Sequence, residues 1–188
     1  MILKEIINII EKWAPVKHAE DFDNVGLLVG NPTNSVKKAL ITIDTLENVV
    51  DEAIENKCDL IISFHPIIFT GLKKLTQETY IERVVIKAIK NNINIYSIHT
   101  NLDNHPKGIN YQFSKHLSLI NIEILIKKNN SEFGMGMIGE LNKELDELHF
   151  LNYLKEKMNV KIIKHSPLLN KKIKKVAVLG GSGSFAIE

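Results

Sequence analysis

Cysteine is almost missing from this sequence, with Cys58 alone among 188 residues. No disulfide can form within the chain, which favours a reducing compartment, and no CxxC pair is available for a zinc site. No apolar run approaches the ~20 residues that a membrane-spanning helix needs. The first residues include the acidic Glu5 and no cleavage site of small residues, unlike a signal peptide. We therefore expect a cytoplasmic protein with no membrane partner.

An excess of charge of one sign is also lacking. The 24 basic residues are nearly matched by 22 acidic ones, which leaves a net charge of +2. Lysine and arginine form no stripe interleaved with aromatic side chains, which argues against nucleic acid as a partner. Hydrophobic residues make up 44% of the chain and charged residues 24%, the balance of an ordinary globular protein. The length suffices for one large domain or two small ones.

Short apolar runs alternate with amphipathic segments in the first part of the chain. Runs rich in isoleucine and bounded by polar residues are typical of buried strands, and apolar residues at helical spacing predict helices. The expected strands are 39–43, 60–63 and 93–98, and the expected helices are 2–13, 46–56 and 79–90. This alternation at βαβ spacing predicts an α/β fold, with helices packed on a parallel sheet.

A second segment begins near residue 121, so we expect two domains, 1–120 and 121–188. Strands are predicted at 122–126, 134–140, 160–163 and 176–179, together with a helix over 143–158 that Asn142 would cap. The Gly-rich turn at 180–184 should lead into a further element, yet the sequence stops at Glu188. We therefore expect a truncated chain whose second lobe is incomplete.

Two polar clusters follow neighbouring strands of the first segment. Ser63-Phe64-His65-Pro66 comes after one strand, and His99-Thr100-Asn101-Leu102-Asp103 comes after the next. Open α/β sheets place their ligands at the carboxyl ends of strands. An imidazole and a carboxylate that meet there can hold a divalent cation, with Zn, Mn, Fe and Ni all acceptable. The alternative for His99 is a structural histidine held by hydrogen bonds. The acidic stretch 20–23 either lines a cleft or forms a solvated loop.

Several short motifs, taken in order, resemble those of the GTP cyclohydrolase 1 type 2 homologue family, also called the Nif-three-like proteins. The matching stretches are 23–30, 59–66, 96–103, 108–110, 134–136 and 180–184. The resemblance implies an α/β fold of two similar lobes, the second incomplete here, and a ring-like homohexamer. It also implies a pair of divalent metals in a cleft and hydrolysis of GTP or a similar nucleotide.

Carried over residue by residue, the family's two adjacent histidines fall on Phe64 and His65, and its carboxylate falls on Asp103. The resemblance thus implies that His65 and Asp103 bind the same metal ion. Phe64 departs from the pattern, because a phenyl ring has no lone pair to donate. The family's remaining ligands, a histidine and a glutamate, lie beyond the glycine turn, past the end of this chain. Two ligands would leave an ion mostly hydrated, short of the three that a catalytic zinc site uses.

The residues leave different functional hypotheses open. In the first, the protein is a metal-dependent cyclohydrolase or hydrolase with an impaired metal centre, and His99 or Asp23 handles protons near the metal. In the second, it is a non-catalytic oligomer that binds metal or nucleotide as a scaffold or regulatory protein. In the third, loss of the end of a lobe exposes apolar strand surface and leaves the product unstable.

Overall fold

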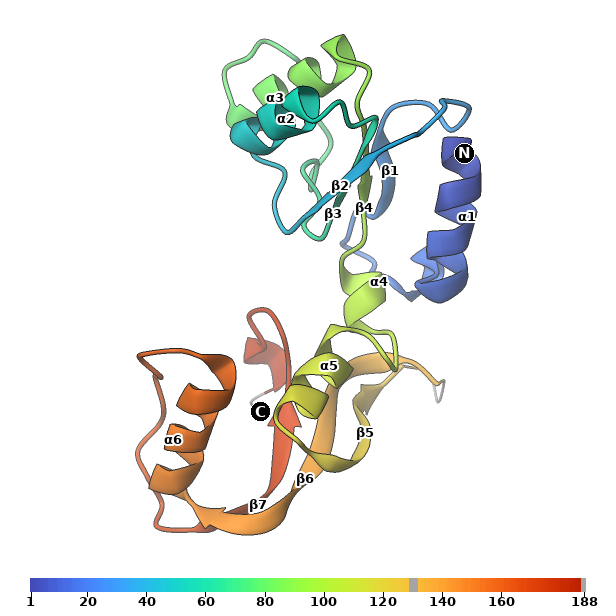
Figure 1. Cartoon of the computed structure of the whole chain (residues 1–188). Coiled ribbons are helices and arrows are strands. Elements are labelled where there is room, and N and C mark those ends of the chain that lie inside the picture. The colour runs from blue at the N-terminus through green and yellow to red at the C-terminus, as the bar shows by residue number, and fades with distance from the viewer. Residues whose placement is uncertain (129–131, 187–188) are drawn as a thin grey trace. The chain divides into compact units, whose positions relative to one another are not determined.

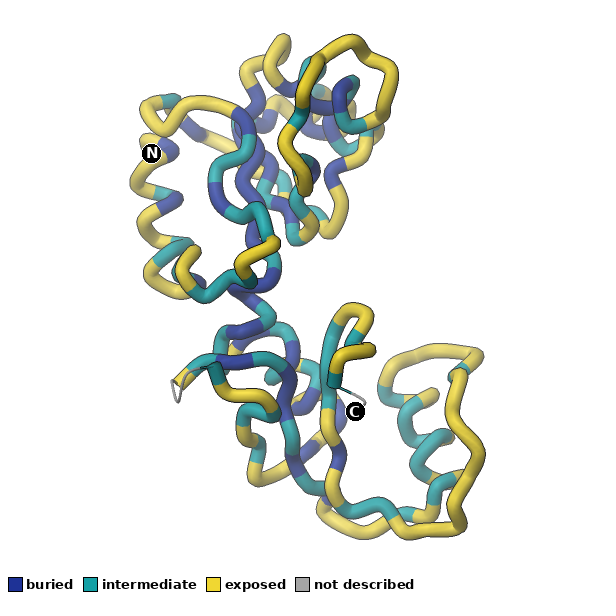
Figure 2. The backbone as a smooth tube through the Cα atoms, turned by 180° about the vertical axis from the view of Figure 1, so that it is seen from behind, coloured by how far each residue is buried: buried dark blue, intermediate teal, exposed yellow. Residues whose placement is uncertain are grey.

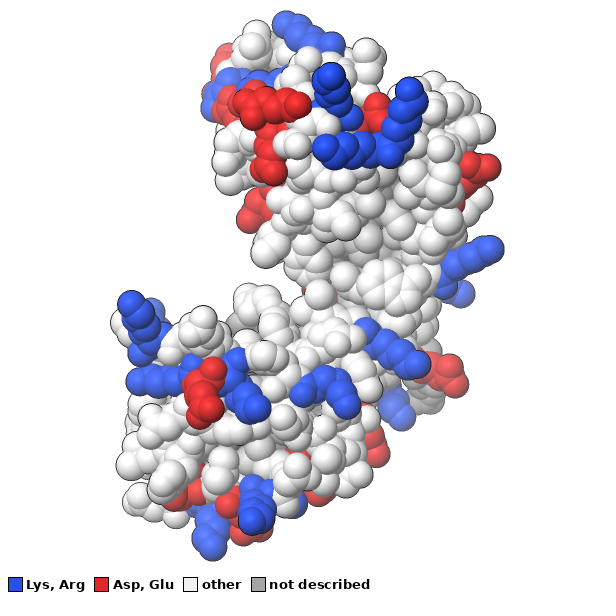
Figure 3. Space-filling view, in the orientation of Figure 1, with Lys and Arg blue, Asp and Glu red and all other residues white. Residues whose placement is uncertain are grey.

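Two β-sheets, each with its own helices, make up the computed structural model, which describes residues 1–128 and 132–186 (Figure 1). The chain divides into two compact units, Met1–Leu102 and Asp103–Glu188. The α/β class expected from the sequence is confirmed. Among the described residues, no helix is both long and apolar enough to cross a lipid bilayer. Lysine, arginine and carboxylate side chains are interspersed on the face shown in Figure 3.

The first unit is built on a four-stranded sheet. Its strands are β1 (Gly26–Val29), β2 (Ala39–Thr42), β3 (Leu60–Ser63) and β4 (Asn94–Ser97), and they lie in the order β1-β4-β3-β2. The strands β2, β3 and β4 run parallel to one another, while β1 pairs with β4 in the antiparallel sense. The predicted parallel arrangement of these three strands is therefore confirmed, with β1 as an additional antiparallel strand, and the carboxyl ends of the three parallel strands share one edge.

The helices of the first unit follow the apolar periodicity of the sequence. They are α1 (Leu3–Trp13), the 3-10 turn η1 (Val16–His18), α2 (Glu47–Glu55), α3 (Tyr80–Lys90) and the single turn α4 (Thr100–Asp103). The helices α2 and α3 lie side by side in Figure 1 and share a core with the parallel strands. That core includes Val50, Ala53, Ile61, Val84, Ala88 and Ile95. Most of β3 and all of β4 are buried, and buried backbone is the dark blue tube in Figure 2.

Gly30 directly follows β1 and has a backbone conformation that disfavours a side chain. Its φ is +118°, and a Cβ atom there would lie 2.0 Å from Oδ1 of Asn94. Asn94 is buried, and its Oδ1 accepts hydrogen bonds from Asn31 N at 3.2 Å and Asn34 Nδ2 at 2.9 Å. The close approach of the turn to Asn94 therefore requires glycine at position 30.

We expect Gly30→Ala to lower the free energy of unfolding by about 3 kcal/mol, because it combines backbone strain with a clash against a buried amide. Urea denaturation followed through Trp13, the single tryptophan and a residue of α1, measures this loss. Gly71→Ala is the matched control, since a Cβ at Gly71 would meet nothing within 4 Å. Equal stability of the two variants would contradict the prediction.

The second unit has an antiparallel sheet in the order β5-β6-β7. Its elements are α5 (Ile109–His116), β5 (Ile120–Lys127), β6 (Gly134–Asp146), α6 (Glu147–Met158), β7 (Lys172–Val178) and the 3-10 turn η2 (Ser184–Ala186). The predicted start of the helix at 143 is wrong, because β6 continues through Leu145, which pairs with Ile173 of β7. Asp146 caps α6 by accepting from His149 N at 3.0 Å, so Asn142 is not the cap. The predicted strand at 160–163 does not form.

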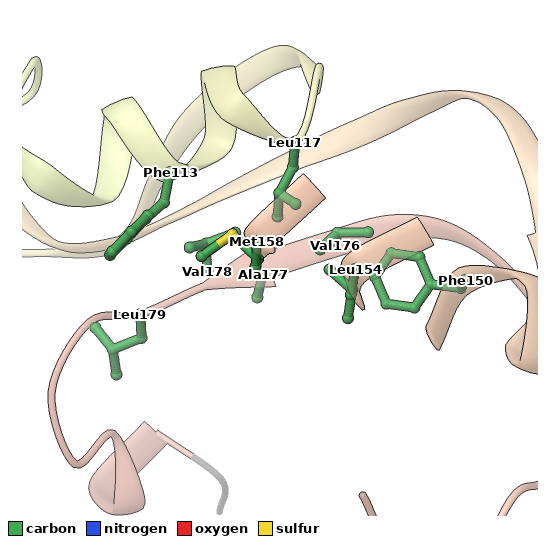
Figure 4. Close-up of a pocket in the computed structure, with 9 residues that line it drawn as sticks. All are labelled: Phe113, Leu117, Phe150, Leu154, Met158, Val176, Ala177, Val178 and Leu179. Carbon is green, nitrogen blue, oxygen red and sulfur yellow. The ribbon is translucent and has the colours of Figure 1, made fainter. Parts of the chain in front are cut away.

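An apolar pocket of about 330 Å³ lies between α5, α6 and β7 of this unit (Figure 4). Its lining consists of Phe113, Leu117, Phe150, Leu154, Met158, Val176, Ala177, Val178 and Leu179. None of these side chains carries a charge or a metal ligand other than the methionine sulfur. The pocket therefore supplies no group for acid-base chemistry.

Candidate functional site

The residues after β3 are held against the end of β2. The backbone N–H of Phe64 donates to Thr42 O at 3.0 Å, and that of His65 donates to Ile43 O at 2.9 Å. The carbonyl of Phe64 accepts from Ser97 Oγ of β4 at 3.0 Å. The pairing between parallel strands thus extends beyond β3 itself. This fixes Phe64 and His65 at the carboxyl edge of the sheet, where sequence reasoning placed them.

His65 forms a pair with Asp44, the second residue after β2. The two atoms His65 Nδ1 and Asp44 Oδ1 are 2.7 Å apart. Because a carboxylate only accepts hydrogen bonds, the proton of a neutral His65 must lie on Nδ1. Its Nε2 then keeps a lone pair for a metal ion or a proton. This is the arrangement in which an outer carboxylate orients a metal-ligating imidazole.

His99 forms a second pair of the same kind, at the end of β4. Its Nδ1 lies 2.9 Å from Oδ1 of Asp23, a residue 76 positions earlier. The Asp23 side chain is fully buried, while 18% of the His99 side chain is exposed. The structure therefore brings together the two residues for which the sequence suggested proton handling. Their catalytic role remains a prediction.

The carboxylate of Asp23 is satisfied by four donors. Besides His99, it accepts from Thr100 N at 3.0 Å, from Thr100 Oγ1 and from Asn24 N at 2.8 Å. Burial by itself raises the pKa of Asp23, but the hydrogen bonds from His99 and Thr100 outweigh it and lower the pKa to about 2. Asp23 is thus an anion at neutral pH that can orient the His99 ring.

The imidazole rings of the two carboxylate–histidine pairs are neighbours. The centroids of the His65 and His99 imidazoles are 5.5 Å apart, with an angle of 78° between the planes. The ring of Phe64 lies 5.1 Å from His65 and 5.3 Å from His99. Phe64, His65 and His99 therefore form a cluster of three neighbouring rings, which we call the three-ring cluster. Its third member is the phenyl ring that replaces an expected imidazole.

The carboxyl edge of the sheet carries the types of atoms that bind divalent ions, but it carries too few of them. Imidazole nitrogen is a common ligand of Zn, Mn, Fe and Ni, and His65 is already oriented by a carboxylate. However, no group of three or more histidine, cysteine or carboxylate side chains is arranged to hold a metal among residues 1–128 and 132–186. Metal binding at this edge therefore stays a prediction.

Asp103, the other predicted metal ligand, is the last residue of α4 and the first of the second unit. Its carbonyl accepts from the side chain of Asn110 at 3.1 Å. Since His65 and Asp103 belong to different units, their sharing of one ion stays a prediction.

Sequence reasoning did not assign a role to Asp44. The signal was present, since Asp44 directly follows a predicted strand, as the two histidine clusters do. Three parallel strands that share an edge would have placed all three ends together.

The structure shows an α/β unit whose parallel strands carry two carboxylate–imidazole pairs at their carboxyl edge, the position where open α/β sheets place their ligands. Comparison with protein families then identifies this chain. The whole chain, residues 1–188, matches the family model Duf34/NIF3 (NGG1p interacting factor 3). The protein therefore belongs to the Duf34/NIF3 family, which confirms the resemblance found in the sequence motifs.

Individual relatives agree with this assignment. The chain is 41% identical over 185 residues to the GTP cyclohydrolase 1 type 2 homolog of Clostridium perfringens, covering 97% of this chain and 70% of that protein. Its fold is similar to the crystal structure of a Staphylococcus aureus protein, with a TM-score of 0.91 and 29% identity over 98% of this chain and 73% of that one. It is also similar to reduced HcgD from Methanocaldococcus jannaschii, with a TM-score of 0.78 and 31% identity over 97% and 71% of the two chains.

Proposed function

We propose that this protein is a divalent-metal-dependent hydrolase that acts on GTP or a related nucleotide in the cytoplasm, as a ring of six copies. The observation that supports it best is the pairing of Asp44 with His65 and of Asp23 with His99 at one sheet edge. The name of the Clostridium perfringens relative supports the choice of substrate. In this proposal, His65 and Asp103 hold the ion.

The two histidines have different tasks in this mechanism. A bound divalent ion supplies a water of lowered pKa and polarises the substrate. His65 presents Nε2 because Asp44 holds its Nδ1. His99 likewise has Nε2 free to accept a proton, and the anionic Asp23 stabilises the imidazolium that results. With a phenyl ring at position 64 of the three-ring cluster, we propose a weakened centre with slow turnover.

Phe64 also favours a second candidate function. A phenyl ring beside two imidazoles offers no lone pair to a metal ion, as expected of a member that does not carry out a two-metal reaction. Such a protein would bind metal or nucleotide as an oligomeric scaffold or regulator. Turnover of GTP distinguishes the two candidates, since only the hydrolase releases product in proportion to added metal.

Calorimetric titration of the whole chain with Mn²⁺ and Zn²⁺ tests the proposal. We expect His65→Ala to weaken metal binding by about tenfold or more. Loss of a residue that only hydrogen-bonds to a metal ligand has an effect of that size, and His65 is a proposed ligand itself. His149→Ala is the matched control, since His149 also pairs through Nδ1 with a carboxylate, that of Asp146, and belongs to the second unit. Metal affinity equal to wild type in His65→Ala would reject the proposed centre. Metal binding without GTP turnover would favour the scaffold.

A further inference from the structure

Two phenylalanine rings face solvent on the loops next to the site residues of the first unit. Phe22 is 66% exposed and Phe69 is 47% exposed. Their ring centroids are 6.3 Å apart, and the planes are inclined by 49°. Single exposed apolar side chains are ordinary in folded proteins. Two exposed aromatic rings brought together from distant parts of the sequence are a more informative feature, because they form a prepared apolar surface.

Both rings are anchored to residues already described. Phe22 immediately precedes Asp23, whose buried carboxylate binds His99. Phe69 follows His65 on the loop after β3. Between them, Asn24 Nδ2 donates to the carbonyl of Ile68 at 2.6 Å and ties one loop to the other. The two rings therefore stand beside each other on loops that are fixed by hydrogen bonds, so little freedom is lost when a ligand binds.

We propose that Phe22 and Phe69 bind the flat heterocycle of a nucleotide by stacking, and that this heterocycle is a purine with N–H donors, such as guanine. The choice of a nucleotide rests on the proposed function. Aromatic rings are general stacking platforms for nucleobases. Asp21, which directly precedes Phe22, is acidic and exposed. Carboxylates accept hydrogen bonds from the N–H edge of guanine and repel phosphate, so the base binds at these rings and the phosphates bind away from them.

A metal-free binding experiment isolates the contribution of the rings. The probes are GTP and inorganic tripolyphosphate, titrated into the whole chain in the presence of EDTA. We expect GTP to bind, tripolyphosphate to bind far more weakly, and Phe22→Ala and Phe69→Ala each to weaken GTP binding by about tenfold. Phe22→Trp should retain GTP affinity, since indole stacks as well as phenyl. Phe185→Ala removes another exposed ring, 58% exposed and part of the second unit, and should leave GTP affinity within about twofold of wild type.

Several results would overturn the inference. GTP affinity unchanged in both alanine variants, or no GTP binding by wild type, would show that the rings bind no base. Oligomers in sedimentation that dissociate in Phe22→Ala, with GTP affinity unchanged, would show that a second copy of the chain covers the rings. The outcome is separable from the metal proposal. If GTP binding depends on the rings but the chain takes up no metal, the hydrolase proposal is rejected and the stacking site stands. If the chain takes up metal but GTP binding does not depend on the rings, the stacking site is rejected and the hydrolase proposal stands.

Discussion

Replacing Asp23 by alanine is expected to lower the free energy of unfolding of the first unit by about 4 kcal/mol. The substitution removes the carboxylate that accepts hydrogen bonds from four donors. These donors belong to His99, Thr100 and Asn24. Each buried donor left without a partner costs about 1–3 kcal/mol, although water can enter to satisfy some of them. Urea denaturation followed by the fluorescence of Trp13 measures the loss in the unit concerned.

The same carboxylate makes the stability of the first unit depend on pH in acid. The pKa of Asp23 is about 2 in the folded chain and 3.8 as the ordinary value. Because the folded pKa is the lower one, the stabilisation is fully present above pH 3.8 and is lost as the pH falls towards 2. The loss amounts to about 2 kcal/mol. We expect Asp23→Asn, which has no charge to lose, to show a correspondingly flatter profile over this range.

Asp51→Asn is the control for the acid profile. Asp51 pairs with Lys87 at 2.8 Å on the surface, and its side chain is 53% exposed. Exposed pairs contribute little to stability, so this variant should follow the wild-type profile. If wild type, Asp23→Asn and Asp51→Asn lose stability in parallel between pH 4 and 2, Asp23 does not provide the acid-sensitive stabilisation assigned to it.

The sheet of the first unit could be predicted because its signals are local. Isoleucine-rich runs of about four residues, separated by amphipathic helices, have few alternatives to a parallel sheet. The position of His65 and His99 after neighbouring strands followed from that topology. Which atoms they contact did not follow, since the Asp23–His99 pair joins residues 76 positions apart and depends on how the loop before β1 meets the end of β4.

The second unit shows where local pattern misleads. Residues 143–158 contain leucines at helical spacing, yet Leu145 remains in β6 because it pairs with Ile173 of β7. Strand pairing over this distance outweighs the helical preference of a few residues. In the same way, 160–163 has a composition typical of a strand but no neighbouring strand to pair with in the described chain. A strand without a partner leaves its backbone groups to water and does not form.

The three-ring cluster gives the largest expected gain of binding. Replacing Phe64 by histidine should tighten Zn²⁺ binding by about a hundredfold. Residues that only hydrogen-bond to a metal ligand already contribute up to about that much to metal affinity, and a histidine at position 64 would be a ligand itself. The phenyl ring lies 5.1 Å from the imidazole of His65 and 5.3 Å from that of His99. An imidazole in its place would add a nitrogen donor next to His65 and bring the centre closer to the three protein ligands that a catalytic zinc site uses.

Phe185→His adds a histidine at an exposed position of the second unit and serves as the control for nonspecific binding. Competition with a zinc indicator gives the affinity, and elemental analysis after dialysis gives the number of ions per chain. A hundredfold gain in Phe64→His alone would show that the sheet edge retains metal-binding geometry and lacks only a donor atom at position 64. Equal affinities in wild type, Phe64→His and Phe185→His would show instead that His65 and a histidine at position 64 do not face a common ion. The proposal of a metal centre at this edge would then fail, whatever the family relationship suggests.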